Sequence, residues 1–213
     1  MDPKTHWEQV YHDKAPDQVS WFQRDARLSR ALIRQVAPDP RTRILDVGAG
    51  ASTLVDGLTE AGYRCLTVLD LSATALDLAR LRLGAAAGGI QWLEADVLTV
   101  PLATGEFDVW HDRAVFHFLT SPAERARYVA QVRRAVRPDG FVLVATFAED
   151  GPTRCSGLEV TRYAPLALHG EFGPDFRLVE SQREEHVTPS GAVQWFTYCL
   201  CRYEPRSREQ TAA

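Results

Sequence analysis

The sequence predicts an α/β fold built on a doubly wound sheet of about seven strands, mostly parallel, with an antiparallel strand at the C-terminal end. Two observations lead to this prediction. Short apolar runs alternate with helical patterns from residue 25 to residue 147, as expected for parallel strands joined by crossover helices. Two extended runs, 176–187 and 193–203, are then joined by the turn TPSGA, whose proline and glycine indicate a tight reversal between antiparallel strands.

Five apolar segments are the expected parallel strands. They are RILDV (43–47), RCLTVL (64–69), 90–94, FDVWH (107–111) and FVLVATF (141–147). The last of them is apolar at consecutive positions, so we expect it to be buried on both faces of the sheet.

Helices are predicted before the first strand and between the strands. Helical spacing of apolar residues favours helices over 6–12, 25–36, about 53–61, 72–83 and 121–136. The turn RPDG (137–140) is expected to end the last of these. Three helix starts carry residues that typically cap a helix: Thr53 with Asp56, Ser72, and Ser121 with Pro122 and Glu124.

The composition excludes several classes of protein. The formal net charge of −4 predicts no general attraction to nucleic acid or to an anionic membrane. No apolar run reaches the roughly 18 residues of a membrane span, and the opening MDPKTHWEQ has no apolar signal region. The four cysteines form no C-x-x-C pair, so we expect reduced thiols, three of them in the core, in a cytoplasmic protein. The six histidines are scattered, which predicts no metal site.

A glycine loop after the first strand is the strongest candidate for a binding site. The segment DVGAGAS (46–52) joins the first strand to a helix, and its glycines allow a sharp turn and a close approach to a ligand. Asp70 ends the next strand, where in nucleotide-binding folds an acid accepts hydrogen bonds from both hydroxyls of a ribose; a solvated loop aspartate is the alternative. Asp96 follows the third strand, where a carboxylate can accept from an adenine amine, although an incidental exposed aspartate is an open alternative.

Four sequence motifs, in order along the chain, indicate more specifically what the glycine loop binds. The runs ILDVGAGAS, VLDLS, EADV and FDVWHD resemble motifs I to IV of the class I S-adenosylmethionine-dependent methyltransferases, over roughly residues 25 to 203. The resemblance implies a Rossmann-like sheet of strand order 3-2-1-4-5-7-6. It also implies S-adenosyl-L-methionine as cofactor and S-adenosyl-L-homocysteine as product.

The same resemblance implies a role for each residue of the motifs. Asp46 would hold the amino-acid part of the cofactor, directly or through water. The other cofactor-binding residues would be Gly48, Ala49 and Gly50 beside the methionine and ribose, Asp70 on the ribose hydroxyls, Leu71 against adenine, and Asp96 with Val97 at the adenine edge. The family often has a third glycine where this chain has Ser52. That residue can cap the helix instead, and the incomplete glycine pattern argues against a dinucleotide.

The polar run His111-Asp112-Arg113 ends the fourth strand and is the candidate catalytic group. Ligands of open α/β sheets bind beyond the carboxyl ends of the strands, so this run is expected beside the transferred methyl. His111 or His117 could act as a base, and Asp112 could orient a cationic acceptor; packing in the core is the alternative for His117.

Two further segments are expected to complete the pocket. Residues 1–24 form a helical, aromatic lid in which Tyr11 and Trp21 close over the cofactor, unless they only pack helices on the sheet. The loop 148–163 is expected to border the acceptor pocket. The methyltransferase domain would then span 25–204, followed by a polar tail, 205–213.

The acceptor leaves several interpretations open. The leading one is methylation of a small molecule by a monomer or homodimer. A protein-lysine methyltransferase is the second, but that group tends to have Asp-Lys-Gly where this chain has Asp112-Arg113-Ala114. A nicotinamide-dependent oxidoreductase and a cofactor-binding module without catalysis are weaker alternatives.

Overall fold

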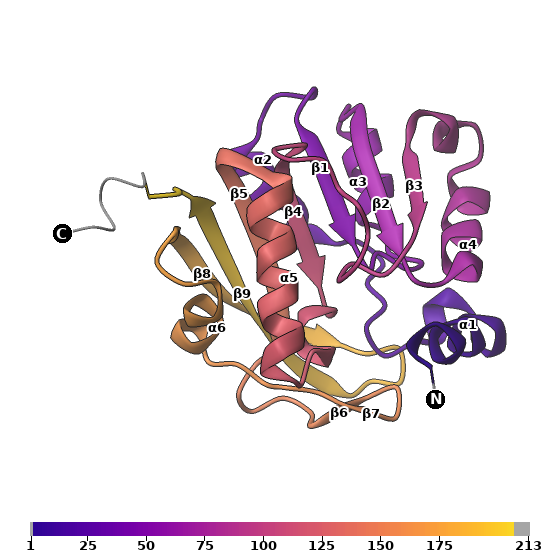
Figure 1. The fold of residues 1–213 in the computed structure, drawn as a ribbon. Helices are drawn as coiled ribbons and strands as arrows, with labels where there is room; N and C mark the ends of the chain where they lie inside the picture. The colour runs from indigo at the N-terminus through magenta and orange to yellow at the C-terminus, as the bar shows by residue number, and fades with distance from the viewer. Residues whose placement is uncertain (1, 207–213) are drawn as a thin grey trace.

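A central sheet of seven strands organises the molecule (Figure 1). The computed structural model describes residues 2–206. Its strand order is β3-β2-β1-β4-β5-β9-β8, with β9 antiparallel to β5 and β8 antiparallel to β9. The strands are β1 (Arg43–Val47), β2 (Cys65–Asp70), β3 (Gln91–Glu94), β4 (Phe107–Arg113), β5 (Val136–Phe147), β8 (Phe176–Val187) and β9 (Val193–Tyr203). This arrangement confirms the predicted mostly parallel sheet and its order.

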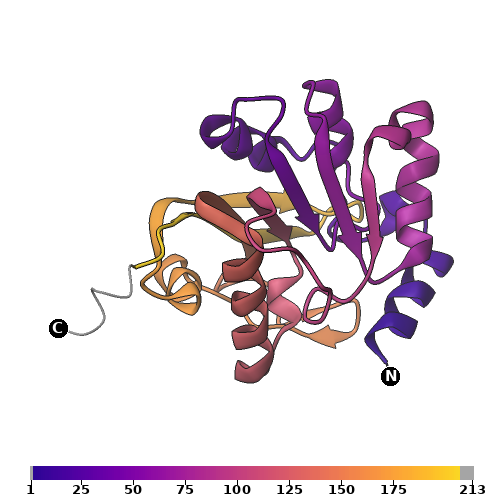
Figure 2. The same ribbon diagram turned by 45° about the horizontal axis from the view of Figure 1, so that its top comes forward.

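Helices cover both faces of the sheet (Figure 2). On one face α2 (Arg27–Val36), α3 (Leu54–Glu60) and α4 (Ala73–Leu83) pack over a core that includes Ile33, Leu54 and Leu76. On the other face α5 (Pro122–Ala135) and α6 (Pro165–Phe172) pack over a core with Trp110 and Tyr128. Three short 3-10 helices, η1 (Pro16–Gln18), η2 (Gly84–Gly89) and η3 (Phe116–Phe118), lie in the connections.

Two of the three predicted helix caps are present. Ser72 accepts a hydrogen bond from the Ala75 N–H at 3.1 Å, and Ser121 and Glu124 form the expected reciprocal cap. The prediction of a cap formed by Thr53 with Asp56 is wrong. The Thr53 hydroxyl instead donates to the Gln23 carbonyl at 3.0 Å, and the Asp56 carboxylate pairs with Arg82. A long-range partner has therefore displaced the local one.

The structure adds three features that the sequence patterns did not reveal. Helix α6 lies before the terminal hairpin. A two-stranded hairpin, β6 (Arg154–Cys155) with β7 (Leu158–Glu159), forms within the segment 148–163 that was expected to be a loop. Strand β5 begins at Val136, directly after α5, so the RPDG segment belongs to that strand and is not a separate turn.

The N-terminal helix α1 (Pro3–Asp13) lies against the start of α4. The Glu8 carboxylate accepts hydrogen bonds from the Ala73 N–H at 2.6 Å and the Thr74 N–H at 3.3 Å, and from the Ser72 hydroxyl at 3.2 Å. Unpaired N–H groups at a helix start favour a carboxylate. An acid of the N-terminal segment therefore fixes α1 beside the carboxyl end of β2.

No helix within residues 2–206 is both long and apolar enough to cross a membrane. Three of the cysteines are buried, as predicted, and Cys65 is exposed. The predicted polar tail falls almost entirely outside the described residues, which end at 206.

Candidate functional site

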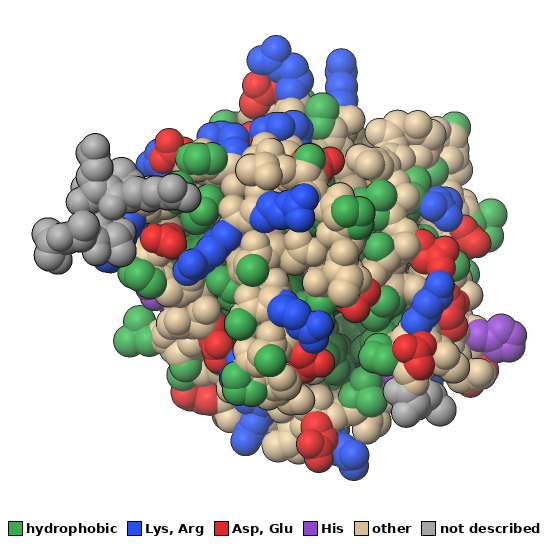
Figure 3. Space-filling model, in the orientation of Figure 1, with side chains coloured by type: hydrophobic (Ala, Val, Ile, Leu, Met, Phe, Trp, Pro, Cys, Tyr) green, Lys and Arg blue, Asp and Glu red, His purple; other side chains and the backbone are tan. Residues whose placement is uncertain are grey.

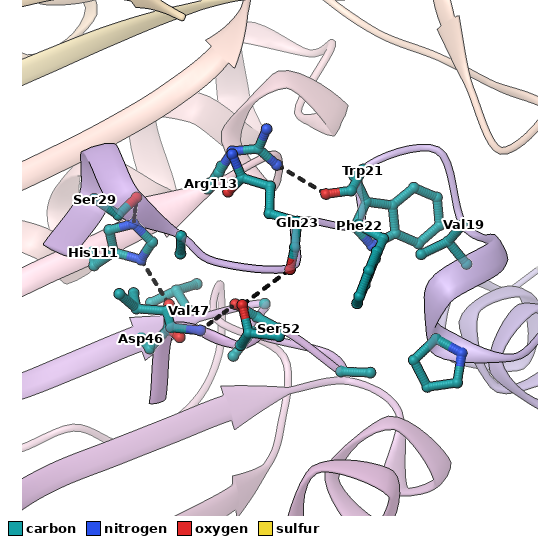
Figure 4. Close-up of a pocket in the computed structure, with 17 residues that line it drawn as sticks. Val19, Trp21, Phe22, Gln23, Ser29, Asp46, Val47, Ser52, His111 and Arg113 are labelled. Carbon is teal, nitrogen blue, oxygen red and sulfur yellow. Dashed lines mark hydrogen bonds and ion pairs between the residues drawn. The ribbon is translucent and has the colours of Figure 1, made fainter. Parts of the chain in front are cut away.

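A cavity of about 460 Å³ lies at the carboxyl ends of the parallel strands. Figure 3 shows it as a hollow with a hydrophobic floor and charged side chains on its rim. A second, small cavity of about 40 Å³ adjoins it (Figure 4). Trp21, Val47, Gly48 and Arg113 line both cavities. The wide cavity is lined by strand ends and their loops, by α1, by the start of α5 and by the β6–β7 hairpin.

The carboxylate of Asp70 faces the wide cavity from the end of β2. One of its oxygens accepts the Gly50 N–H at 2.7 Å and the other accepts the Ser72 N–H at 2.8 Å. Burial raises the pKa of Asp70 to about 6, although both N–H groups favour the charged form. Each carboxylate oxygen can accept more than one hydrogen bond, so the two oxygens of Asp70 can also accept hydrogen bonds from two hydroxyl groups of a ligand.

The two glycines of the loop are required by close approaches. Both have positive φ, +58° at Gly48 and +52° at Gly50, where other residues are strained. A Cβ at Gly50 would lie 2.1 Å from the Tyr11 hydroxyl oxygen, and one at Gly48 would lie 1.9 Å from Cγ2 of Val115. The loop therefore leaves room for the lid residue on one side and for the chain after β4 on the other.

The expected adenine end of the cavity is mostly apolar. Leu71, Asp96 and Val97 all line it, next to Leu69 and Leu98. One Asp96 oxygen accepts the Leu98 N–H at 2.8 Å, which orients the carboxylate. The structure thus brings together, around one cavity, the predicted residues at the ends of β2 and β3.

Aromatic side chains of the N-terminal segment form the side of the cavity opposite the strand ends. Tyr11 and Trp21 both line it, as does Trp7. The Trp7 ring packs edge-on against Trp21 at 5.7 Å and Phe118 at 5.1 Å. Tyr11 is buried, and the loss of solvent raises the pKa of its hydroxyl far above the ordinary value. It is therefore a neutral hydrogen-bonding group at the site.

His111 lies in the small cavity, and both of its ring nitrogens are engaged (Figure 4). Its Nδ1 is 2.7 Å from Asp46 Oδ1, and its Nε2 is 2.9 Å from the Ser29 hydroxyl. The ring is buried, at 3% exposure. These contacts argue against the predicted role of His111 as a base at the methyl group.

Asp112 lies outside both cavities, contrary to the predicted role in the pocket. One oxygen accepts the Val115 N–H at 2.8 Å, and the other accepts the Phe116 N–H at 3.0 Å and the Tyr128 hydroxyl at 2.5 Å. Its side chain is fully buried, and burial raises its pKa to about 6. The carboxylate fixes the start of η3 and lines neither cavity.

Arg113 connects the lid to the C-terminal hairpin. Its guanidinium donates to the Trp21 carbonyl at 3.1 Å, to the Tyr198 hydroxyl at 3.0 Å and to the Glu184 carboxylate at 3.3 Å. It also lies 4.0 Å from the centre of the Phe196 ring, in cation–π contact. Although it lines both cavities, its hydrogen bonds go to the protein, so its contacts indicate positioning of the lid.

His117 lies in the core, which was the alternative prediction for it. Its ring packs against Phe118 and Phe147, and burial lowers its pKa to about 3. The neutral Nδ1 accepts the Phe147 N–H at 3.3 Å. It lines neither cavity.

Sequence reasoning missed four residues that line the wide cavity: Phe118 and Leu119 after β4, and Glu124 and Arg127 on α5. The segment 148–163 does border the cavity, as expected, through Cys155, Leu158 and Glu159. Ser29 was missed as well, because only the fold brings α2 next to His111. Within residues 2–206, no three histidine, cysteine or acidic side chains are grouped as a metal site would require.

The comparison with protein families agrees with this geometry. Residues 44–140 match a family model described as "Methyltransferase domain". The match runs from β1 into β5 and so contains the glycine loop, Asp70 and Asp96.

Two curated proteins are similar to parts of this chain. One is the ubiquinone/menaquinone biosynthesis C-methyltransferase UbiE of Roseobacter denitrificans, 32% identical over 56% of this chain and 48% of its own length. Another is the eEF1A lysine and N-terminal methyltransferase of Danio rerio, 25% identical over 68% of this chain and 21% of its own length. The chain thus spans between about a fifth and a half of these relatives.

A solved structure shows the same fold over nearly the whole chain. It is 1,6-didemethyltoxoflavin-N1-methyltransferase from Burkholderia thailandensis, with bound 1,6-didemethyltoxoflavin and S-adenosylhomocysteine. The TM-score is 0.68 at 20% identity, covering 95% of this chain and 87% of the other. The chain therefore shares the Rossmann-like fold of this methyltransferase.

Proposed function

We propose that the chain binds S-adenosyl-L-methionine and transfers its methyl group to a small-molecule acceptor by in-line displacement, leaving S-adenosyl-L-homocysteine. The observation that carries the proposal is the pair of carboxylates at the ends of neighbouring strands. Asp70 faces the wide cavity with both oxygens oriented, and Asp46 lines the small cavity beside it. One carboxylate in each of two adjoining cavities suits a single ligand that carries both a ribose and an amino-acid ammonium group.

The residues present fit this cofactor part by part. The Asp70 oxygens suit the ribose hydroxyls, and Leu71 and Val97 offer an apolar surface for adenine. Oδ2 of Asp46 is buried without a hydrogen-bond partner in the described chain, which suits an ammonium group. Trp21 lines both cavities, where an aromatic face attracts a sulfonium.

The chemistry then depends mainly on position. The cofactor supplies a methyl group already activated on a sulfonium, so the protein has to align the two partners and exclude water. Among residues 2–206, no histidine side chain lines the wide cavity. The contacts of the predicted run 111–113 support roles in holding Asp46, η3 and the lid, and not in taking a proton from the acceptor.

A small molecule is the favoured acceptor. The part of the cavity left beyond the cofactor lies between Phe118, Leu119 and Leu158, with Arg127 and Glu159 at its edge. The lid on one side and the β6–β7 hairpin on the other leave a confined, largely apolar space, which suits a metabolite. The UbiE relative and the toxoflavin enzyme, by their names, act on small molecules.

A protein-lysine acceptor is the second candidate, because the Danio rerio relative is a lysine and N-terminal methyltransferase. The test is a calorimetric titration with S-adenosylmethionine and with NAD, followed by isotope-labelled methyl donor in a cell extract. Label in the low-mass fraction supports the proposal, and label in protein supports the lysine alternative. Binding of NAD but not of S-adenosylmethionine would overturn both.

A further inference from the structure

A chain of three buried side chains runs behind the small cavity. Asp46 in β1 and His111 in β4 are directly opposite each other in the sheet, so their side chains share a face. Ser29 reaches the far side of the His111 ring from α2. The exposed fractions are 4% for Asp46, 3% for His111 and 0% for Ser29. Their contacts are therefore shielded from water.

The hydrogen positions of this chain follow from what each group can donate. An ionised carboxylate only accepts, so His111 Nδ1 carries the hydrogen toward Asp46 Oδ1. A neutral imidazole then has an acceptor at Nε2, which takes the Ser29 hydroxyl hydrogen. Ser29 thus favours the tautomer that Asp46 needs, and the ring is held at both ends.

One oxygen of this carboxylate is left without a partner. Oδ1 of Asp46 is held by His111, while Oδ2 is buried and makes no hydrogen bond within residues 2–206. An unpaired buried carboxylate oxygen costs free energy unless a ligand completes it. The adjoining cavity of about 40 Å³ has room for about three water-sized groups, which suits the polar end of an amino acid but not an aromatic ring.

We propose that His111 is a positioning residue for the amino-acid end of the cofactor. By holding Oδ1 it turns Oδ2 of Asp46 toward the small cavity, where that oxygen accepts from the α-ammonium group. This assignment rests on the proposed function. It gives His111 a part in binding the cofactor and none in taking a proton from the acceptor.

The test compares two ligands that differ only at the end in question. S-adenosylhomocysteine carries the amino-acid group, whereas 5′-methylthioadenosine lacks it and retains the adenosine. Calorimetry on His111→Leu should show about a tenfold or greater loss of affinity for S-adenosylhomocysteine, the effect of losing one charge-assisted hydrogen bond. Affinity for 5′-methylthioadenosine should stay within about twofold, since Asp70 and the adenine surface are unchanged.

A conservative variant separates positioning from packing. His111→Asn places an amide N–H near the position of Nδ1 and should regain most of the lost affinity for S-adenosylhomocysteine. Ser29→Ala removes the hydroxyl that favours the correct tautomer and should give an intermediate loss. Thermal unfolding shows whether each variant folds. If His111→Leu does not fold, the affinities of the two milder variants test the role of His111.

Each outcome has a distinct meaning. If the unmodified protein binds neither ligand, the proposed function fails. If it binds both, and the variants keep the original ratio of the two affinities, the role of His111 is overturned while the function stands. An equal loss for both ligands would also overturn it, because a general structural defect acts on both.

Discussion

Replacing Arg113 should loosen the lid more than it disturbs the rest of the fold. The guanidinium ties the Trp21 carbonyl to Glu184 and Tyr198 of the C-terminal hairpin, and its side chain is only 9% exposed. Arg113→Met keeps most of the side-chain volume but removes every one of these hydrogen bonds. Glu184 is left in a site where its side chain is only 15% exposed.

The expected loss can be worked from these contacts. Removing one partner of a buried ion pair costs about 3–5 kcal/mol. The lower end applies because Glu184 still accepts from the Tyr198 hydroxyl at 2.9 Å and the Gln23 amide at 3.0 Å. About 3 kcal/mol corresponds to a fall in Tm of roughly 6–12 °C for a chain of this length. Arg113→Lys keeps the charge but not the fork of donors, and should cost about 1–2 kcal/mol.

Two assays together test this reasoning. Chemical or thermal unfolding gives the stability loss. Limited trypsin digestion reports on the lid, because the exposed Lys14 and Arg24 lie within it and flank Trp21. Arg133→Met is the matched control, since Arg133 pairs with Asp175 away from the lid. Arg113→Met should speed cleavage at the two flanking sites, and the control should not.

A double variant gives the result that would refute the argument. In Arg113→Met with Glu184→Gln, the uncompensated carboxylate is gone, so part of the lost stability should return. If the double variant is less stable than Arg113→Met by the full cost of the Glu184 change, the two side chains are not coupled. Unchanged proteolysis of Arg113→Met would equally show that this arginine does not hold the lid.

Four further predictions concern the cavity and its supports. Gly50→Ala should destabilise the protein by about 1–3 kcal/mol, because φ is +52° and the new Cβ would lie 2.1 Å from the Tyr11 hydroxyl oxygen. Chemical unfolding of the variant measures this loss, and an unchanged free energy of unfolding contradicts the prediction. Affinity for S-adenosylhomocysteine should be constant above about pH 7 and fall as the pH drops through the pKa of Asp70, about 6, because protonation of the carboxylate removes a hydrogen-bond acceptor. Calorimetry at several pH values measures this, and an affinity that does not change with pH would mean that Asp70 makes no contact with the ligand. The raised pKa of the same group means that the folded state binds more protons than the unfolded state between about pH 4 and 6, so its contribution to stability is lost as the pH rises through that window. Tyr128→Phe should cost about 1–3 kcal/mol by removing the bond to Asp112 but leave cofactor affinity unchanged, and a loss of affinity comparable to that of an Asp70 variant would place Asp112 in the site after all.

The sheet could be predicted from the sequence because each parallel strand is a local apolar run between helices. The segments 43–47, 107–111 and 141–147 all lie within observed strands. Helix α6 could not be recognised in this way, since it is only 8 residues long and contains a glycine. The cap at Thr53 failed for the opposite reason, because its hydroxyl has a partner 30 residues away that no local pattern contains.

The positions of the three aspartates around the cavities were predictable because they depend on chain order. A residue at the carboxyl end of one parallel strand is brought beside the end of the next, so Asp46, Asp70 and Asp96 meet once the strand order is known. To predict the roles of residues 111–113 at the end of β4, the alternation of side chains along a strand must also be considered. Side chains alternate along a strand, so His111 and Arg113 share one face of the sheet while Asp112 points to the other, toward Tyr128. That alternation was visible in the sequence and would have separated Asp112 from the site.

The lid shows why the acceptor is harder to infer than the cofactor. Three of its backbone carbonyls are held by side chains from distant elements: Ser20 by His186, Trp21 by Arg113 and Gln23 by Thr53. The position of the Trp21 ring over the cavity thus depends on β8, β4 and the start of α3 together. The β6–β7 wall is a short hairpin, which pairs Arg154 with Glu159 and Cys155 with Leu158. Since the acceptor would lie between these two walls, its identity depends on long-range contacts and on a short hairpin that the fold does not require, whereas the aspartates that line the cavities are placed by the sheet itself.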